Sequence, residues 1–181
     1  MNILVDFDDS FTFNVKQFFL DASIELTVVN WKEISSSYNQ NINLIVLGPG
    51  PGHPSEYQSL FPFLKEMIEK DVKIFGVCLG HQILMSLIGF QVKRLKKPIH
   101  GRAREVKLNS VFENLFSDNK VTAQFYNSLY VVPNDNKKSV ENCIVQNNEV
   151  LAYKFRNIFS TQFHIESIGT SHCSNLLKNL Y

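Results

Sequence analysis

The chain has 181 residues, of which 44% are hydrophobic and 19% are charged. This length predicts a single domain, residues 1–181, with a substantial buried core. The formal net charge of +1 excludes a general binding field for polyanions, so nucleic acid is not an expected partner.

Strand-like and helix-like segments alternate in the first half of the chain. Apolar runs predict strands at residues 3–5, 25–30, 43–47 and 72–77. Helical spacing predicts helices at residues 57–70 and 83–88 and another from about Ser10, with a buried stripe of Phe11, Val15, Phe18 and Phe19. This order predicts an α/β fold, an open, mostly parallel, doubly wound sheet with flanking helices of the flavodoxin-like kind. The functional site is expected at the carboxyl ends of its strands.

The second half is richer in predicted strands, which fall at residues 91–95, 103–108, 121–126, 144–146 and 150–155. The pair Asn147 and Asn148 predicts a tight hairpin between the last two. Residues 158–163 alternate apolar and polar side chains as a half-buried strand does, and residues 170–180 predict a final helix. A smaller antiparallel region is therefore expected beside the parallel sheet.

Cys78 lies between a predicted strand and a predicted helix, in the run Gly76-Val77-Cys78-Leu79-Gly80-His81-Gln82. Such an abrupt turn is strained and crowded, and Gly76 and Gly80 leave it the room that it needs. The amides that open the helix would point at the thiol and favour its thiolate. The pattern indicates a nucleophile elbow. The alternative is that Cys78 is a small buried hydrophobe.

A cysteine nucleophile needs a base, and His164 follows a strand-like run late in the chain. In an extended chain the side chains at i and i+2 face the same way. Glu166 can then accept a hydrogen bond from one imidazole nitrogen while the other nitrogen faces the thiol. The predicted catalytic residues are therefore Cys78, His164 and Glu166. The alternative is that the histidine and the glutamate form an ordinary surface pair.

Residues 47–54 form a loop of alternating glycine and proline after the third predicted strand. The prolines would fix its backbone and the glycines would expose its amides, so that the loop could hold an anion or an oxyanion. The alternative is a tight crossover turn. The loop lacks the Lys-Ser or Lys-Thr ending of a phosphate-binding P-loop, which argues against a nucleotide triphosphatase.

A locally basic run comprises Lys93, Arg94, Lys96, Lys97, Arg102 and Arg104. It predicts either a solvated hairpin face or a docking surface for a partner protein. An acidic cluster, Asp6, Asp8 and Asp9, precedes the first predicted helix. We expect Asp9 or Ser10 to cap that helix.

The chain has three cysteines, Cys78, Cys143 and Cys173, none of them close to another in sequence. Their odd number and wide spacing favour a reducing compartment and neither a disulfide framework nor a zinc site, so no metal is expected. The strand-like start at residues 2–7 leaves no room for a signal peptide, and no apolar run approaches the roughly 20 residues that span a bilayer. A cytoplasmic protein with no membrane partner is therefore expected.

Together these features resemble the class I, or triad, glutamine amidotransferases. The most similar members are the glutaminase subunits (component II) of anthranilate synthase and aminodeoxychorismate synthase. The resemblance covers nearly the whole chain. It rests on motifs at residues 6–14, 47–54, 76–82, 100–102, 125–129 and 162–167, in the same order as in the family.

The resemblance implies that Cys78 attacks the side-chain amide of L-glutamine, that His164 protonates the departing ammonia and then activates water, and that Glu166 orients the ring. It also implies an oxyanion hole made by the backbone amides of Gly50 and Leu79. The residues implied to bind glutamine are Gly50, Pro51, Gly52, Gln82, Ser128 and Leu129. The ammonia would pass to a chorismate-binding synthase subunit (component I), and no cofactor or metal is implied for this chain.

The chain departs from the family pattern at two positions. Asn127 stands where histidine is usual, next to the glutamine-binding pair, which bears on fine positioning or on signalling to a partner. Ile165 replaces a proline between His164 and Glu166, and the loss of that fixed φ angle would loosen the geometry of the pair.

Two alternatives to a glutamine-hydrolysing subunit stay open at this stage. One is a catalytically silent scaffold of the same synthase, which the retention of all three triad residue types disfavours. The other is a flavodoxin-like or receiver-like signalling module in which the acidic cluster forms a magnesium pocket. That module requires an aspartate where this chain has Gly48 and Pro49. The sequence leaves open whether the product is anthranilate or aminodeoxychorismate.

Overall fold

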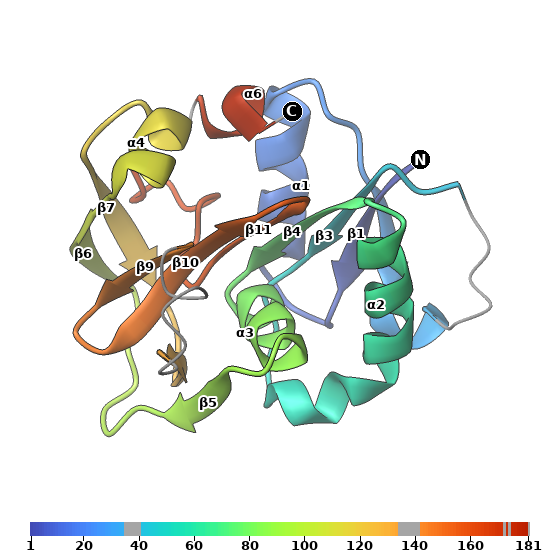
Figure 1. The fold of residues 1–181 in the computed structure, drawn as a ribbon, viewed down its shortest axis with the longest axis horizontal. Helices are drawn as coiled ribbons and strands as arrows, with labels where there is room; N and C mark the ends of the chain where they lie inside the picture. Colours follow the sequence, from blue (N-terminus) through green and yellow to red (C-terminus); the bar gives the residue numbers. More distant parts are fainter. Residues whose placement is uncertain (35–40, 134–141, 172, 174, 181) are drawn as a thin grey trace.

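The computed structural model describes residues 1–34, 41–133, 142–171, 173 and 175–180, and its centre is a seven-stranded sheet (Figure 1). In spatial order the strands are β2 (Thr27–Asn30), β1 (Asn2–Asp6), β3 (Leu44–Leu47), β4 (Lys73–Val77), β11 (Ile158–Thr161), β10 (Glu149–Phe155) and β9 (Cys143–Gln146). The pairs from β2 to β11 are parallel, whereas β10 is antiparallel to both of its neighbours. The prediction of an open, mostly parallel sheet is confirmed.

Helices pack on both faces of this sheet (Figure 1). They are α1 (Thr12–Asp21), the 3₁₀ helices η1 (Trp31–Glu33) and η2 (Pro54–Leu60), α2 (Phe61–Glu69), α3 (Leu79–Leu87), α4 (Ser110–Phe116) and α6 (Leu176–Leu180). Leu4 and Val46 belong to a buried cluster with α1, α4 and α6, whereas Ile3 and Ile45 belong to a second cluster with η2, α2 and α3. Because both faces are covered, the central strands appear in the sequence as continuous apolar runs.

Two small antiparallel sheets flank the main one. They pair β5 (Gln91–Arg94) with β8 (Leu129–Val132), and β6 (Arg102–Lys107) with β7 (Lys120–Phe125). The hairpin between β9 and β10 turns at Asn147 and Asn148, whose φ angles of 53° and 61° are those that a two-residue hairpin requires. The expected antiparallel region and its hairpin are both confirmed.

Strand β8 and helix α4 were not predicted. The apolar run of β8 has only four residues before Pro133, too few for a periodic signal. Helix α4 carries a recognisable start, because the Asn109 side chain accepts a hydrogen bond from the Phe112 N–H (3.4 Å). Its apolar residues Phe112, Leu115 and Phe116 lie at helical spacing and are buried.

The start of the first helix differs from the prediction. Helix α1 begins at Thr12, and its capping residue, Phe11, makes no side-chain cap. The Asp9 carboxylate accepts instead from the Phe11 N–H (2.8 Å), and the Asp6 carboxylate accepts from the Thr12 hydroxyl (2.6 Å). The prediction that Asp9 or Ser10 caps the helix was therefore wrong, because these carboxylates fix the turn before the helix.

The predicted helix at 57–70 is two segments. Tyr57 has non-helical angles (φ −109°, ψ 17°) inside η2, and the α-helix starts only at Phe61. Pro62 explains the start, since proline lacks an N–H and fits only the first turn of a helix. The helix after Cys78 is longer than predicted, because it begins directly at Leu79.

The last helix is shorter than the predicted 170–180 and begins at Leu176; residues 172 and 174 lie outside the described residues. Thr170 and Ser171 are bound to β7 instead. Their hydroxyls accept from the Gln124 and Thr122 N–H groups, both at 3.0 Å. Hydroxyl side chains that bond to backbone outside a helix compete with helix formation. The helix therefore does not include Thr170 and Ser171, and its predicted start was wrong.

Strand β11 also differs from the expected half-buried strand. It ends at Thr161, and all four of its residues are buried. The reason is its place between β4 and β10, where helices cover both faces. Across the described residues, we find no helix with the length and apolar character needed to cross a membrane.

Helix α3 carries a fully buried histidine, His81, directly behind the elbow. Its Nδ1 lies 2.9 Å from Ser160 Oγ, and its Nε2 lies 3.0 Å from the Val150 carbonyl oxygen. A carbonyl can only accept, so Nε2 carries the proton and Nδ1 accepts from the serine. Burial lowers the pKa of His81 from 6.5 to about 4. The neutral ring therefore joins α3 to the sheet.

Acid is expected to destabilise the fold through His81. Below about pH 6.5 His81 takes up a proton in the unfolded chain, whereas in the folded chain it does so only near pH 4. This contribution to the free energy of unfolding is complete above pH 6.5 and is lost as pH falls through about 4. Urea unfolding at about pH 7.5 and about pH 5 should differ by about 2 kcal/mol from this source. In His81→Gln, which cannot titrate, that loss should disappear; an equal loss would contradict the assignment.

Candidate active site

Cys78 lies at the abrupt turn from β4 into α3. Its backbone angles (φ 53°, ψ −101°) are positive in φ, a conformation that is strained for a residue with a side chain. Its N–H donates to the Thr161 carbonyl (2.9 Å), which fixes the turn against β11. The side chain is 8% exposed, at the carboxyl end of the parallel sheet. This is the geometry of a nucleophile elbow.

The two glycines around Cys78 are required by close contacts. A Cβ on Gly76 would lie 2.8 Å from backbone atoms of Gly80, and a Cβ on Gly80 would lie 2.7 Å from Leu47 Cβ. Real Cβ atoms do not approach other atoms this closely. The spacing that the sequence showed therefore reflects crowding between β3, β4 and α3.

The structure brings His164 and Glu166 together. Nδ1 of His164 lies 2.6 Å from Oε1 of Glu166, and the two side chains are 2% and 0% exposed. The pair lies in a turn, closed by the Ser167 N–H donating to the His164 carbonyl (3.3 Å), because β11 ends earlier at Thr161. The predicted extended geometry at these positions was therefore wrong, although the two side chains meet.

The charge on His164 is set by its two neighbours. Burial disfavours the charged ring, but hydrogen bonding and negative charge from Cys78 and Glu166 outweigh burial and raise the pKa of His164 to about 10. Glu166 accepts the hydrogen bond from Nδ1, so the thiol interacts with the side of the ring that carries Nε2. Nε2 is buried and makes no hydrogen bond of regular geometry. Near neutral pH the ring is therefore an imidazolium, which can donate a proton. This contribution to stability is complete below pH 6.5 and is lost as pH rises through about 10.

Replacing Glu166 with glutamine should lower the pKa of His164 from about 10 towards its ordinary value, because a charge and a strong hydrogen bond are removed. Glutamine hydrolysis should fall by about a hundredfold or more, since the ring also loses its orientation. Titration of the imidazole by NMR measures the first effect. Glu105→Gln, which changes an exposed glutamate paired with Lys120, is the control and should alter neither. An unchanged His164 titration in Glu166→Gln would contradict the assigned cause.

Residues from distant parts of the chain hold the imidazole in place. The rings of Phe11 and Tyr126 pack edge-on at centroid distances of 5.3 and 4.9 Å from the His164 ring. The His164 N–H donates to the Gln124 carbonyl (3.0 Å), and the Thr170 hydroxyl donates to the His164 carbonyl (2.6 Å). Sequence reasoning assigned none of these roles. Phe11 and Tyr126 lie within motifs of the resemblance, which is the signal that was available.

The glycine-proline loop lies against the elbow. A Cβ on Gly50 would lie 2.5 Å from Leu79 Cδ2 and 2.6 Å from Phe7 Cβ, so the two residues expected to form the oxyanion hole are packed together. The Gly80 N–H donates to the Gly48 carbonyl (3.1 Å) and ties the loop to α3. The oxyanion role of Gly50 and Leu79 stays a prediction, and their proximity is compatible with it.

The outer part of the loop is also fixed. The Tyr57 hydroxyl donates to the Pro51 carbonyl (3.0 Å), and the His53 N–H donates to Glu56 Oε1 (2.6 Å). Gly52 has a φ angle of 79°, which disfavours any other residue. Pro51 and Gly52, expected to contact glutamine, therefore lie in a rigid segment.

The other residues expected to bind glutamine meet across α3 and β8. Gln82 is 3% exposed, and its Nε2 donates to the Leu129 carbonyl (3.2 Å) and to Gln162 Oε1 (3.0 Å). Ser128 is exposed, and its carbonyl accepts from the Leu95 N–H (2.9 Å). Contact of these residues with glutamine stays a prediction. Gln162 had no predicted role, although a glutamine inside a buried run was a signal.

The two departures from the family pattern have local explanations. Asn127 is 3% exposed and its Nδ2 donates to the Leu129 carbonyl (2.8 Å), while its Oδ1 is buried without a hydrogen-bond partner. Ile165 is 2% exposed and belongs to the core cluster that contains Phe163. Burial of this side chain anchors the turn between His164 and Glu166 without the fixed φ angle of proline.

The two charged clusters do not join the site. Asp8 pairs with Lys32 (3.1 Å), and the other two aspartates serve the turn before α1. Within residues 1–34, 41–133 and the later described ranges, no group of three or more His, Cys, Asp or Glu side chains is placed to hold a metal ion. Of the basic run, Arg104 pairs with Glu149 (3.3 Å). The exposed Lys93, Arg94, Lys96 and Lys97 leave both interpretations of that run open.

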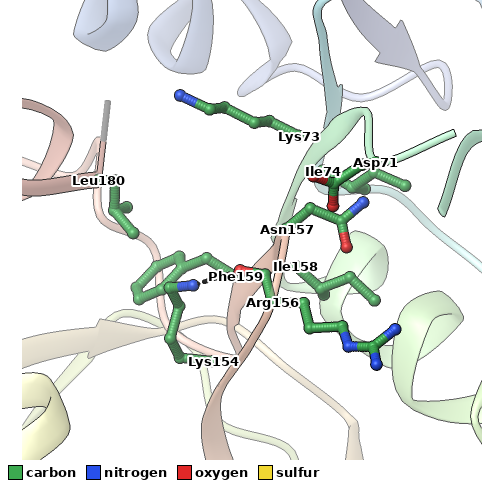
Figure 2. A pocket seen from close by; sticks show the side chains of 9 residues that line it. All are labelled: Asp71, Lys73, Ile74, Lys154, Arg156, Asn157, Ile158, Phe159 and Leu180. Carbon is green, nitrogen blue, oxygen red and sulfur yellow. Dashed lines mark hydrogen bonds between the residues drawn. The ribbon is translucent and has the colours of Figure 1, made fainter.

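A cavity of about 390 Å³ lies at the opposite end of the sheet (Figure 2). Its walls include Lys73 at the start of β4, Lys154 and Asn157 beside the turn into β11, and Leu180. Figure 2 shows Arg156 pointing away from the two lysines. The cavity is separated from Cys78 by the length of β4, and none of Cys78, His164 and Glu166 lines it, so it is not the site of the triad.

A family model described as glutamine amidotransferase class-I matches residues 3–181. The chain belongs to this family. The match includes the elbow, the glycine-proline loop and the turn that carries His164 and Glu166. The three side chains at the site of this class-I glutamine amidotransferase therefore lie within the matched region.

Curated relatives of this amidotransferase include proteins of two lengths. Anthranilate synthase component 2 of Cyanidium caldarium is 33% identical over 191 residues, which cover 99% of this chain and 96% of that protein. Aminodeoxychorismate synthase of Streptomyces pristinaespiralis is 32% identical over 190 residues, which cover 98% of this chain and 25% of that protein. The chain therefore spans nearly the whole of one relative and a quarter of the other.

A solved structure shares the fold. The crystal structure of a glutamine amidotransferase from Methylobacillus flagellatus superposes with a TM-score of 0.74 at 13% identity, over 92% of this chain and 70% of that one. At this identity the likeness concerns the fold alone. It agrees with the parallel sheet and flanking helices described above.

Proposed function

We propose that this chain is the glutamine-hydrolysing subunit of a chorismate-using synthase, either anthranilate synthase or aminodeoxychorismate synthase. The names of the relatives that match nearly the whole chain support the synthase. The observation that carries the proposal is the assembly of a cysteine in a strained elbow with a buried imidazolium and carboxylate. A silent scaffold has no need of this strained and charged arrangement.

In the first step, the Cys78 thiolate attacks the side-chain amide carbon of L-glutamine. The carbonyl oxygen becomes an oxyanion, for which the backbone N–H groups of Gly50 and Leu79 are the donors. The His164 imidazolium gives its proton to the amide nitrogen, the carbon–nitrogen bond breaks, and ammonia leaves. A γ-glutamyl thioester on Cys78 is the product of this step.

In the second step, the now neutral His164 takes a proton from water, and the hydroxide attacks the thioester. The carbon–sulfur bond breaks, glutamate leaves, and the thiolate and imidazolium are restored. Glu166 holds the ring through Nδ1 during both proton transfers. The raised pKa of His164 fits a group that begins each cycle as an acid. The ammonia passes to the synthase subunit, which adds it to chorismate.

The decisive experiment supplies the chain with each candidate chorismate-binding subunit in turn. We expect one of them to co-purify, to stimulate glutamate release from glutamine, and to form its aromatic product with glutamine as the nitrogen source. The product identifies the pathway. The chain alone should turn over weakly, because in the proposed complex the partner organises the site. Failure of every such subunit to bind the chain or to stimulate it would overturn the proposal.

A further inference from the structure

A continuous row of buried amide groups links strand β8 to the nucleophile. Gln82 Nε2 lies 3.2 Å from the Leu129 carbonyl oxygen and 3.0 Å from Gln162 Oε1, and Gln162 Nε2 lies 3.7 Å from Cys78 Sγ. Gln162 is 0% exposed and Gln82 is 3% exposed. Water does not reach these groups, so each interaction counts for more than it would at the surface.

The direction of each hydrogen bond follows from the end of the row. The Leu129 carbonyl can only accept, so the Gln82 atom that faces it is the NH₂ group. The same NH₂ group faces Gln162, which must therefore present its oxygen. The NH₂ group of Gln162 is then the one directed at Cys78 Sγ. The hydrogen-bond network thus determines which end of the Gln162 amide is oxygen and which is nitrogen.

We propose that Gln162 is a further catalytic residue, which donates a hydrogen bond to the sulfur of Cys78 and is oriented for this by Gln82. The inference rests on the proposed role of Cys78 as nucleophile. Sulfur accepts hydrogen bonds weakly as a thiol and more strongly as a thiolate, so the donor favours the reactive form. The same donor stabilises the sulfur when the thioester breaks and the negative charge returns.

The test measures the reaction of Cys78 with iodoacetamide, which requires the thiolate but no glutamine or partner. Gln162→Glu keeps the oxygen that faces Gln82 and replaces the donor to sulfur with an acceptor. At about pH 7 alkylation should slow by about tenfold or more, because the donor is lost and the new carboxylate also repels the thiolate. Gln162→Met removes the donor without adding charge and serves also if the first variant does not fold. Its alkylation should slow about tenfold at about pH 7 and approach the wild-type rate at about pH 9.5, where thiols ionise without help.

Two controls isolate the effect. Asn157→Asp makes the same amide-to-carboxylate change directly before β11, where the side chain donates to the Val72 carbonyl (2.6 Å), and should leave Cys78 alkylation unchanged. Burial raises the pKa of both Cys143 and Cys173 to about 12, so these thiols should not react near pH 7. Peptide mass spectrometry assigns the alkylated residue.

The outcomes separate this inference from the proposed function. Wild-type rates in the Gln162 variants at about pH 7 would overturn the donor role and leave the nucleophile in place. Equal slowing of Gln162→Met at both pH values would show a structural effect and would overturn the donor role as well. If wild-type Cys78 reacts no faster than Cys143 and Cys173, the nucleophile itself fails, and both proposals fall.

Discussion

Replacing Cys78 with serine is expected to abolish glutamate release, with kcat lowered by about ten-thousandfold or more. A serine hydroxyl is not ionised near neutral pH and needs a base to remove its proton. The thiolate–imidazolium pair is also lost with the sulfur, because the hydrogen bond and the negative charge of Cys78 are among the causes that raise the pKa of His164 to about 10. Glutamate release in the presence of the synthase subunit measures the loss.

The Cys78→Ser complex should still form its aromatic product when ammonia is added directly, since only the hydrolysis of glutamine is removed. Cys143→Ala is the matched control. Cys143 is buried in β9, away from the elbow, and should be dispensable for glutamine hydrolysis. Substantial glutamate release by Cys78→Ser would show that another residue attacks glutamine.

Gly80→Ala is expected to reduce the free energy of unfolding by about 3 kcal/mol. The new methyl group would lie 2.7 Å from Leu47 Cβ and 2.8 Å from the Leu47 carbonyl carbon, atoms of a central strand that cannot move aside. It would also separate the Gly80 N–H from the Gly48 carbonyl, a bond that ties the glycine-proline loop to the elbow. Urea unfolding measures the cost, and glutamine hydrolysis should fall with it.

Gly89→Ala provides the comparison for Gly80→Ala. Among the described residues, no heavy atom beyond its chain neighbours lies within 4 Å of a Cβ on Gly89, but its φ of 94° is strained for alanine. Backbone strain alone should therefore lower the free energy of unfolding of this variant, by about 1 kcal/mol. If the two variants were equally stable, crowding at the elbow would not be the reason for Gly80.

The sheet could be predicted because covered parallel strands leave continuous apolar runs, as in β3 and β4. The boundaries of the helices could not be predicted in this way, because they depend on contacts with residues that are distant in sequence. Thr170 and Ser171 have helix-compatible neighbours in sequence, yet their hydroxyls bond to β7, about 50 residues away. The burial of β11 on both faces likewise depends on its position in the sheet and not on its own alternation.

The residue types of the triad could be predicted because each carries a local signal. Gly76 and Gly80 report the crowding of the turn, and the spacing of His164 and Glu166 permits their contact. The residues that support the triad carried weaker signals, which did not assign them a role. Phe11 and Gln162 reach the site only after the two ends of the chain fold together.

The position of β11 affects how this protein matures. Among the described strands of this sheet it comes last along the chain, yet it lies between β4 and β10. Until it inserts, the edge of β4 has no partner on that side and is open to pairing with other chains. The same insertion delivers the turn with the imidazole, so a nascent chain should be vulnerable to aggregation and unable to consume glutamine until β11 and this turn have been made.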